Sequence, residues 1–449
     1  MDMLRNFHYT NVLVLGLARS GTAAAKILLE NGKNVRITDR DADWHDNNVQ
    51  ELQALGAELI LGTHPISILD NIEVIVKNPG IPYEVPLLVE AKERGIPIIT
   101  EIEIAGQLAP NSIIGITGSN GKTTTTTLTT KMLAASDQNV KVAGNIGTVA
   151  TDVAQDLTKD ETLVLELSSF QLLGVQTFKP KVAVLLNIYE AHLDYHKTLE
   201  NYQQAKCNIF INQSKDDYLV YNAENETVVK AINDAKATLI PFSTKTYQRN
   251  GAYVDEEFIY FQGEKIINRK DVVLVGDHNL ENILASISAA KLNGATNEGI
   301  KQVLTTFSSV KHRLQFVKNI HDRIFYNDSK ATNILATQKA LASFQQPVIL
   351  LAGGLDRGNG FSDLLPYLQG VKAMVVFGQT APKLKTIAEQ AGIGLIEEAD
   401  NVDDAVPKAY ELSEANDVIL LSPACASWDQ YKTFEQRGDM FIQAVHRLM

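Results

Sequence analysis

The sequence predicts an α/β protein in which helices alternate with parallel strands in three domains. Short runs rich in Val, Ile and Leu recur along the chain, and most are followed by a longer helical stretch. Such continuous apolar runs are typical of strands that are buried on both faces of a parallel sheet. The chain of 449 residues is also too long for one hydrophobic core. We therefore expect domains at residues 1–109, 110–310 and 311–449.

The composition excludes several classes of protein. The net charge of −12 argues against a nucleic-acid partner, because that binding depends on cations that contact phosphates. No stretch reaches the ~18 uninterrupted apolar residues of a membrane-spanning helix. The N-terminal sequence MDMLRNFHYTNVLVLG does not resemble a signal peptide. Cys207 and Cys425 lie far apart in sequence, so we expect no disulfide framework and a reducing cytoplasmic location. We also expect a monomer.

The first domain opens with a Rossmann-type β-α-β unit. Residues 11–16 predict a strand, Gly16–Gly21 a turn into an alanine-rich helix, and residues 35–38 a second strand that ends at Asp39. Ala18 replaces the middle glycine that lets a pyrophosphate lie against the backbone. A dinucleotide oxidoreductase and a nucleotide-sugar diphosphate site both remain open readings. The further strands expected here are 72–76, which leads into the loop NPGI, and 98–100.

The central domain begins with a phosphate-binding loop. Residues 113–116 predict a buried strand, and Gly118 and Gly121 allow a tight turn whose backbone N–H groups surround an anion. Lys122 can reach phosphate oxygens, and the Thr123 hydroxyl can bind a phosphate-bound Mg²⁺. The motif G-x-x-x-x-G-K-[ST] is incomplete, because an isoleucine stands at its first glycine. An ordinary glycine-rich turn is the alternative, but the Lys–Thr pair favours a nucleoside-triphosphate site.

Polar side chains follow the next strands of this domain, which we expect at 140–143, 162–167 and 182–187. Glu166 is a candidate Mg²⁺ ligand, because Mg²⁺ prefers carboxylate oxygens, although pairing with a lysine would also explain it. His192 could complete the metal site or be an ordinary loop histidine. The cluster of His192, Asp194 and His196 suggests zinc only weakly, because no cysteine lies nearby. Lys206, on a helix expected from 199 to 211, is by base rate a solvated lysine.

The end of the central domain contains a further nucleotide-binding candidate. Residues 218–275 predict short strands, including an apolar run at 272–275, before a long helix that opens with GDHNLEN. Asn279 and Asn282 lie about one turn apart on that helix and could bind an adenine edge. A helix N-cap would explain Asn279 equally well.

The third domain repeats the pattern, with strands expected at 324–327, 348–352, 373–377 and 418–421. Arg313 and Lys330 are cations that could neutralise a transferring γ-phosphoryl group, and surface ion pairs are the alternative. Residues 422–427 precede an expected helix, whose N-terminal N–H groups could hold a carboxylate.

With these motifs the chain resembles the bacterial Mur ligase family over nearly its whole length. The resemblance rests on seven motifs: GITGSNGKTT (115–124), GNIG (144–147), LELSSFQL (165–172), HLD (192–194), GDHNLEN (276–282), NDSKATN (327–333) and SPACASWDQYKTFEQRG (422–438). The first, third and sixth are shared with other ATP-dependent amide-forming ligases, including folylpolyglutamate synthetase. The last motif and NPGI at 78–81 point to the D-glutamate-adding branch of the family.

The resemblance implies a Rossmann-like N-terminal domain for a UDP-sugar, a central P-loop ATPase domain and a Rossmann-like C-terminal domain for an amino acid. It implies that ATP converts the alanyl carboxylate of UDP-N-acetylmuramoyl-L-alanine to an acyl phosphate. The amine of D-glutamate would then attack, forming a tetrahedral intermediate that releases phosphate. Another Mur-type or folylpolyglutamate-type ligase, a nicotinamide oxidoreductase and a regulatory ATP-binding module are the alternatives.

The resemblance also implies the site residues. ATP and its phosphates would contact Gly118, Asn120, Gly121, Lys122, Thr123, Thr124, Asn279, Asn282, Arg313 and Asp328. Two Mg²⁺ sites would be served by Thr123, Glu166, His192 and a carbamylated Lys206, and the catalytic residues would be Lys122, Glu166, His192, Lys206 and Lys330. The UDP-sugar would contact Ser20, Asp39, Arg40, Gly80, Asn145 and Ser168, and D-glutamate would contact Thr332, Arg357, Ser427 and Phe434. Some relatives carry lysine at position 357, which would change the geometry of a carboxylate contact there.

Overall fold

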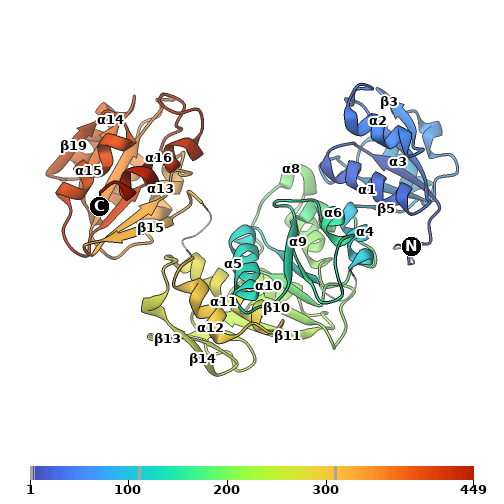
Figure 1. Ribbon diagram of the computed structural model, residues 1–449, viewed down its shortest axis with the longest axis horizontal. Coiled ribbons are helices and arrows are strands. Elements are labelled where there is room, and N and C mark those ends of the chain that lie inside the picture. The colour runs from blue at the N-terminus through green and yellow to red at the C-terminus, as the bar shows by residue number, and fades with distance from the viewer. Residues whose placement is uncertain (1–3, 5, 110–112, 308–310, 449) are drawn as a thin grey trace. The chain divides into compact units, whose positions relative to one another are not determined.

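The structure is a computed structural model that describes residues 4, 6–109, 113–307 and 311–448 (Figure 1). Its strands form three sheets, of five, nine and six strands. The chain divides into two compact units, of which the first comprises Met1–Ile267 with Glu281–Val303 and contains the first two sheets. The second unit comprises Asn268–Leu280 with Leu304–Met449 and contains the third sheet. The expected domain boundaries fall at Pro110 and Val310, which lie outside the described residues.

The first sheet is parallel and has the order β3-β2-β1-β4-β5. Alternate residues of β1 point into two separate cores, with Val12 and Val14 in one and Leu13 and Leu15 in the other. Helices cover both faces of such a sheet, which is why its strands are apolar throughout. The four strands expected here are confirmed, and β3 is an additional strand. The elements are β1 Asn11–Leu15, α1 Arg19–Glu30, β2 Asn34–Asp39, α2 Asn47–Ala54, β3 Glu58–Leu61, η1 Ile66–Leu69, β4 Val74–Lys77, α3 Pro86–Glu93, β5 Ile98–Ile99 and α4 Glu101–Leu108.

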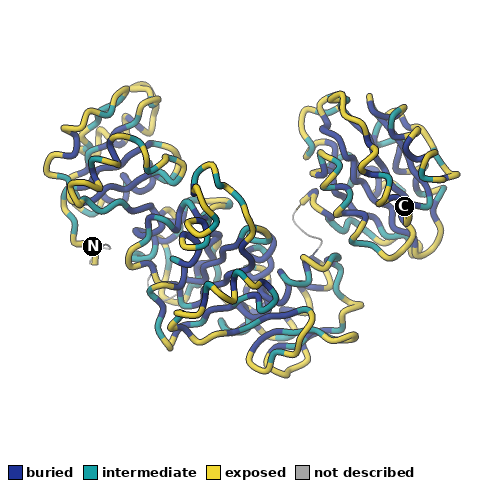
Figure 2. Tube along the Cα trace, turned by 180° about the vertical axis from the view of Figure 1, so that it is seen from behind, coloured by how far each residue is buried: buried dark blue, intermediate teal, exposed yellow. Residues whose placement is uncertain are grey.

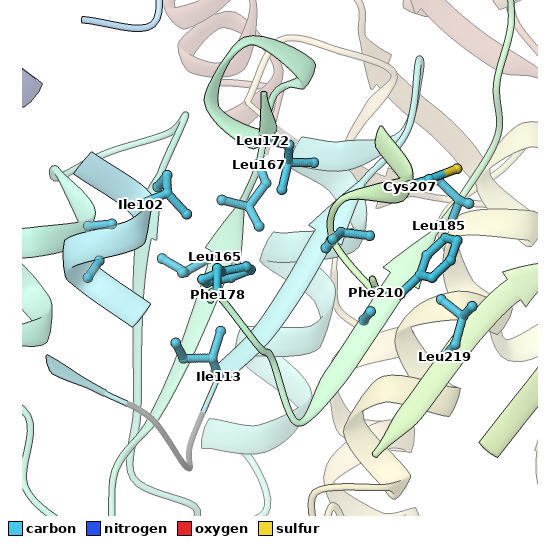
Figure 3. Close-up of a cluster of buried hydrophobic side chains, with 14 of the residues drawn as sticks. Ile102, Ile113, Leu165, Leu167, Leu172, Phe178, Leu185, Cys207, Phe210 and Leu219 are labelled. Carbon is cyan, nitrogen blue, oxygen red and sulfur yellow. The ribbon is translucent and has the colours of Figure 1, made fainter. Parts of the chain in front are cut away.

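The second sheet has the order β14-β13-β12-β11-β10-β9-β6-β8-β7. Strands β6 to β12 pair in parallel, whereas β12 and β13 pair antiparallel. Figure 3 shows one core of this sheet, in which Ile113, Leu165 and Leu185 are buried. Its strands are β6 Ile113–Thr117, β7 Val140–Gly144, β8 Thr162–Glu166, β9 Val182–Leu185, β10 Tyr218–Asn222, β11 Thr238–Ser243, β12 Ala252–Val254, β13 Phe258–Phe261 and β14 Glu264–Asn268. The helices from 122 to 304 are α5 Lys122–Ala134, α6 Ala150–Ala154, α7 Ser169–Leu172, α8 Leu193–His196, α9 Leu199–Cys207, α10 Glu226–Ala231, η2 Arg269–Asp271, α11 Asp277–Lys291 and α12 Asn297–Leu304.

Two expectations for this region are wrong. The apolar run 272–275 is not a strand. It is an extended connection in which Val273 N donates to Leu304 O and Leu274 is buried, so its apolar character reflects packing without a strand partner. The helix that begins at Leu199 ends at Cys207 rather than at 211. A tighter turn follows, in which Phe210 N donates to Cys207 O.

The third sheet has the order β15-β16-β20-β17-β18-β19, with an antiparallel first pair and parallel pairs elsewhere. Its expected strands are confirmed, and β15 and β19 are additional. Alternation again separates two cores, since Leu350 and Leu420 lie in one and Ile349 and Ile419 in the other. The elements are β15 Gln315–Ile320, β16 Arg323–Asn327, α13 Ile334–Leu341, β17 Val348–Gly353, η3 Ser362–Gly370, β18 Val371–Phe377, α14 Ala381–Gln390, β19 Leu395–Ala399, α15 Val402–Leu412, β20 Val418–Leu421 and α16 Phe434–His446.

Burial follows this architecture, because most central strands are buried and much of the chain between the strands and helices is exposed (Figure 2). Within the described ranges, no helix is both long and apolar enough to cross a membrane.

Candidate active site

The candidate site of the first unit lies where β6, β8 and β9 end. These strands are parallel neighbours, with Ile116 opposite Glu166 and Thr117 opposite Leu185. The carboxyl ends of parallel strands meet at one edge of the sheet, which is where ligands bind in open α/β sheets. The loop after β6, Glu166 and the residues after β9 therefore lie together.

The loop after β6 has the conformation that its glycines predict. Gly121 has a φ of 85° and precedes the first residue of α5. A Cβ added there would lie 2.2 Å from Asn282 Oδ1, so no other residue fits without movement. The loop is tied to the end of β9, because Asn120 N donates to Asn187 Oδ1 at 2.8 Å. The N-terminus of α5 and the loop N–H groups together favour an anion.

Lys122 and Thr123 form the first turn of α5, and both are half-buried. Lys122 Nζ donates to Gly118 O at 2.8 Å and to Ser119 O at 3.0 Å. Burial lowers the pKa of the Lys122 ammonium, and the carboxylate of Glu166 opposes that shift. The next residue, Thr124, is buried.

Glu166 is 1% exposed at the end of β8. Its Oε1 accepts a hydrogen bond from Asn145 Nδ2 at 2.8 Å. Its Oε2 is buried and has no hydrogen-bond partner among the described residues. A buried carboxylate oxygen left without a partner is costly, and a hard cation such as Mg²⁺ would satisfy it. The residues present therefore fit a Mg²⁺ ion. Among the described residues Glu166 forms no ion pair with a lysine, and the charge of Lys122 acts on it only at longer range.

Lys206 is buried in α9 with 1% exposure, so the reading as a solvated lysine is wrong. Its Nζ donates to Gly118 O at 2.9 Å, the same carbonyl that Lys122 contacts, and lies 4.6 Å from the centre of the Tyr202 ring. Burial, helped by the charge on Lys122, holds the pKa of Lys206 well below its usual value. Lys206 lies one turn after Tyr202 on the buried face of α9. Because lysine is almost always solvated, its residue type did not predict this burial.

His192 is exposed and precedes α8, with a φ of 54°. Its ring lies 5.1 Å from the Phe170 ring and 6.2 Å from the Tyr202 ring. His196 is buried and shares a hydrogen bond with Ser169 Oγ, and burial lowers its pKa to about 4. In the part of the chain that the structure describes, no three His, Cys, Asp or Glu residues gather into a metal site, so the zinc cluster is not assembled.

Asn279 and Asn282 are both buried in α11. Asn279 is not the N-cap, because the helix begins at Asp277; its Nδ2 instead donates to Val275 O at 2.7 Å. Asn282 accepts a hydrogen bond from Thr125 Oγ1 at 3.4 Å, and its side chain borders Gly121. Asn282 is therefore part of the phosphate-loop surroundings.

The second unit holds the remaining nucleotide candidates. Asp328 is buried at the end of β16, where it accepts hydrogen bonds from Leu314 N and Ser422 Oγ. Burial raises the pKa of Asp328 to about 7. Arg313 and Lys330 are exposed, and Lys330 Nζ lies 5.5 Å from the centre of the Phe434 ring.

A cluster in the second unit gathers around the loop after β20. Ser427 Oγ is buried without a hydrogen-bond partner in the described ranges, which is the kind of donor a carboxylate would satisfy. The exposed Arg357 lies with its guanidinium 5.1 Å from the centre of the Trp428 ring. Ser427 does not begin a helix as expected: Gln430 N and Tyr431 N donate to its carbonyl in a turn, and α16 begins only at Phe434. Thr332 and Phe434 are half-buried.

Arg437, which sequence reasoning missed, joins the loops of this cluster. Its fully buried guanidinium donates to Ser329 O at 2.9 Å, Cys425 O at 3.0 Å and Gly353 O at 3.3 Å. Ser329 and Cys425 lie in the loops after β16 and β20, and Gly353 is the last residue of β17. The only signal in the sequence is a charged residue within the motif TFEQRG, which does not reveal its burial.

The first sheet has a pocket of about 230 Å³ at its strand ends, lined by Leu17, Ala18, Asp39, Asp41, Ala42, Asp46, Asn48 and Val49. The Asp39 carboxylate accepts hydrogen bonds from the N–H groups of Leu17, Asp41 and Ala42, so it shapes the pocket. Ser20 Oγ accepts a hydrogen bond from Asn78 Nδ2, which joins the first loop to NPGI. Arg40 is exposed and pairs with Asp41, and Gly80 is also exposed.

Comparisons with known proteins identify the family. Three family models match: the Mur ligase MurD-like N-terminal domain at residues 10–100, the Mur ligase middle domain at 116–290 and the Mur ligase glutamate ligase domain at 312–425. The chain belongs to the Mur ligase family. It is 62% identical over 448 residues to the UDP-N-acetylmuramoylalanine–D-glutamate ligase of Oceanobacillus iheyensis. It is 56% identical over 450 residues to the enzyme of the same name from Geobacillus kaustophilus, and both comparisons cover 100% of each chain.

Solved structures support the same fold. The MurF ligase of Thermotoga maritima in complex with ADP superposes with a TM-score of 0.56 at 17% identity, covering 99% of this chain and 98% of that one. A UDP-N-acetylmuramoyl-L-alanyl-D-glutamate–2,6-diaminopimelate ligase superposes with a TM-score of 0.59, also at 17% identity, covering 97% and 92%.

Proposed function

We propose that this protein is a cytoplasmic, monomeric ATP-dependent ligase that joins D-glutamate to UDP-N-acetylmuramoyl-L-alanine in peptidoglycan precursor synthesis. The observation that carries the proposal is full-length identity of 55–62% to relatives named for this activity. Residues 1–109 would bind the UDP-sugar, 110–310 the nucleotide and 311–449 the amino acid.

ATP is the nucleotide that the loop after β6 fits best. Its glycine turn and the N-terminus of α5 favour a polyphosphate, and Lys122 can move from its loop carbonyls to phosphate oxygens. The solved relative that holds ADP supports the same nucleotide class. The remaining ATP contacts are assigned to Asn120, Thr124, Asn279, Asn282, Arg313 and Asp328.

Two Mg²⁺ ions are proposed as cofactors, held by Thr123 at one site and by Glu166, His192 and a carbamylated Lys206 at the other. The orphaned Oε2 of Glu166 supports the second site. When bound, Mg²⁺ would neutralise charge on the phosphate oxygens.

The chemistry then follows from positioning and charge. The alanyl carboxylate attacks the γ-phosphorus, ADP leaves, and an acyl phosphate forms. The amine of D-glutamate attacks the acyl carbon, loses a proton and displaces phosphate. Lys122 and Lys330 supply positive charge where the phosphoryl group is transferred, which is the main contribution a protein makes to such reactions.

Binding of the two substrates is assigned to two separate sets of residues. The UDP-sugar would lie along Ser20, Asp39, Arg40, Gly80, Asn145 and Ser168. Each carboxylate of D-glutamate would meet a different donor, one at Arg357 and one at Ser427, with Thr332 and Phe434 beside them. The unpartnered Ser427 Oγ supports this assignment.

Phosphate release with UDP-N-acetylmuramoyl-L-alanine tests the amino-acid assignment. D-Glutamate should support turnover, whereas D-alanine should be slower by ~10⁴-fold, because a site built for a second carboxylate leaves donors unpaired when that group is missing. Comparable rates with D-alanine, or a preference for meso-diaminopimelate or L-lysine, would assign the protein to another branch of the family.

Trp428 should support D-glutamate binding through Arg357. Replacing Trp428 with alanine should raise KM for D-glutamate by about 2–5-fold, the range of an exposed cation–π contact, while KM for ATP stays unchanged. Trp428→Phe is the matched control, because a phenyl ring keeps part of the contact. An unchanged KM for D-glutamate in Trp428→Ala would show that the ring does not orient Arg357.

A further inference from the structure

Lys77 is a buried lysine with no assigned function, and burial lowers its pKa to about 7. It is the last residue of β4 and is 0% exposed. Its Nζ donates to three carbonyl oxygens of the loop that follows, Asn78 O at 3.0 Å, Pro79 O at 3.0 Å and Ile81 O at 2.8 Å. Across the described ranges Lys77 forms no ion pair, so the loop carbonyls take the place of a carboxylate.

Tyr195, in helix α8, contacts both Lys77 and the loop that follows it. Lys77 Nζ donates to Tyr195 Oη at 3.2 Å. The Tyr195 hydroxyl in turn lies 3.3 Å from Pro79 O and 3.0 Å from Ile81 O, so it donates to carbonyls that Lys77 also contacts. Tyr195 belongs to α8, which begins directly after His192, and its ring stands edge-on to Phe170 at 4.7 Å.

Aromatic rings enclose the cation further. Lys77 Nζ lies 4.7 Å from the centre of the Tyr83 ring and 5.9 Å from that of Tyr195. Lys92 Nζ lies 4.6 Å from the same Tyr83 ring but belongs to an exposed side chain. The two lysines thus share one ring, and only Lys77 also contacts the loop.

The physical consequence concerns the shape of the loop 78–81. Three carbonyl oxygens that point at one spot repel one another and would be left unsatisfied in a buried site without a donor. An ammonium group supplies three N–H donors, which the three carbonyls and the Tyr195 hydroxyl share, so it holds this conformation where an apolar side chain could not. The same loop contains Gly80, and Asn78 joins it to Ser20. Gly80 and Ser20 are both assigned above to binding of the UDP-sugar.

We propose that Lys77 and Tyr195 are positioning residues that hold the loop 78–81 against α8, in the shape that receives the UDP-sugar substrate. This inference rests on the proposed function. Neither side chain touches the reacting atoms; Lys77 acts through the loop backbone, and Tyr195 fixes the loop to the segment that begins after His192.

The test uses Tyr195→Phe, which removes the hydroxyl and keeps the ring on Phe170, and Lys77→Met, which keeps an unbranched chain and removes the donors. Tyr195→Phe should raise KM for UDP-N-acetylmuramoyl-L-alanine by about 3–10-fold, the loss of one hydrogen bond, with KM for ATP and D-glutamate unchanged. Lys77→Met should raise this KM further. In the double variant the rise in KM should be smaller than the product of the two single rises. Lys92→Met is the matched control and should behave as the parent.

Calorimetric binding of the same UDP-sugar separates this inference from the proposed function. A parent that binds the UDP-sugar but does not ligate D-glutamate contradicts the proposed reaction, and the affinities of the variants still test the positioning. Unchanged affinity in both variants would overturn the inference. So would an equal rise in KM for all three substrates with a lowered Tm, because that pattern indicates only a structural contribution. Should Lys77→Met fail to fold, Tyr195→Phe decides.

Discussion

Replacing Lys122 with alanine should lower kcat for ligation by at least ~10²-fold, while the protein stays folded. This is the scale of losing one charge-stabilising group. Among the residues that the structure describes, Lys122 Nζ donates hydrogen bonds only to carbonyls of its own loop, Gly118 O and Ser119 O. Burial lowers its pKa, which means that the folded protein bears a cost for its charge. Removing that charge should therefore leave Tm close to the parent value. Phosphate release and thermal unfolding together check this result.

Lys131→Ala is the control for that experiment. Lys131 lies in the last turn of the same helix α5 and is exposed, so its loss should change neither kcat nor Tm appreciably. Near-normal ligation by a folded Lys122→Ala protein would contradict the assignment of the loop after β6 to ATP phosphates.

Replacing Lys206 with alanine should also remove most activity, and short carboxylates such as acetate should restore part of it. Carbamate formation requires the neutral amine, which bonds to the carbon of CO₂ and releases a proton. Burial lowers the pKa of Lys206, which favours that neutral form. The reaction turns a cation into an anion with two oxygens, the ligand type that Mg²⁺ prefers. At ~4 Å and an effective dielectric of ~20, each unit of charge is worth roughly 4 kcal/mol before desolvation.

Lys206→Arg tests whether this position requires a carbamate or only a large side chain. A guanidinium fills the position, stays charged and forms no carbamate, so this variant should be inactive and should not respond to acetate. We expect acetate to restore activity to Lys206→Ala but not to Lys206→Arg. The measurement is phosphate release against acetate concentration. A Lys206→Ala enzyme as active as the parent would end the carbamate hypothesis.

The chemistry-bearing residues that could be predicted are those that follow strands. Glu166 and the Gly118–Lys122 loop were predictable because apolar runs mark β6 and β8, and parallel strands bring their ends together. Lys77, Lys206 and Arg437 were not recognised as buried. Lys206 and Arg437 donate to carbonyls that are distant in sequence, and Lys77 donates to the loop that follows it and to the distant Tyr195. The run 272–275 and the start of α16 were misjudged for a related reason. Packing without a strand partner and a turn before a helix leave the same local pattern as a strand and a helix start.

The discontinuous first unit has a consequence for synthesis of the chain on the ribosome. Residues Glu281–Val303 return to that unit after an excursion through Asn268–Leu280, and they bring Asn282 against Gly121. The surroundings of the phosphate loop are therefore incomplete when its own strands and helix have already emerged. A nascent chain released before α11 would hold the loop without its neighbour. The surroundings of the phosphate loop are thus completed only after all nine strands of the second sheet have been made.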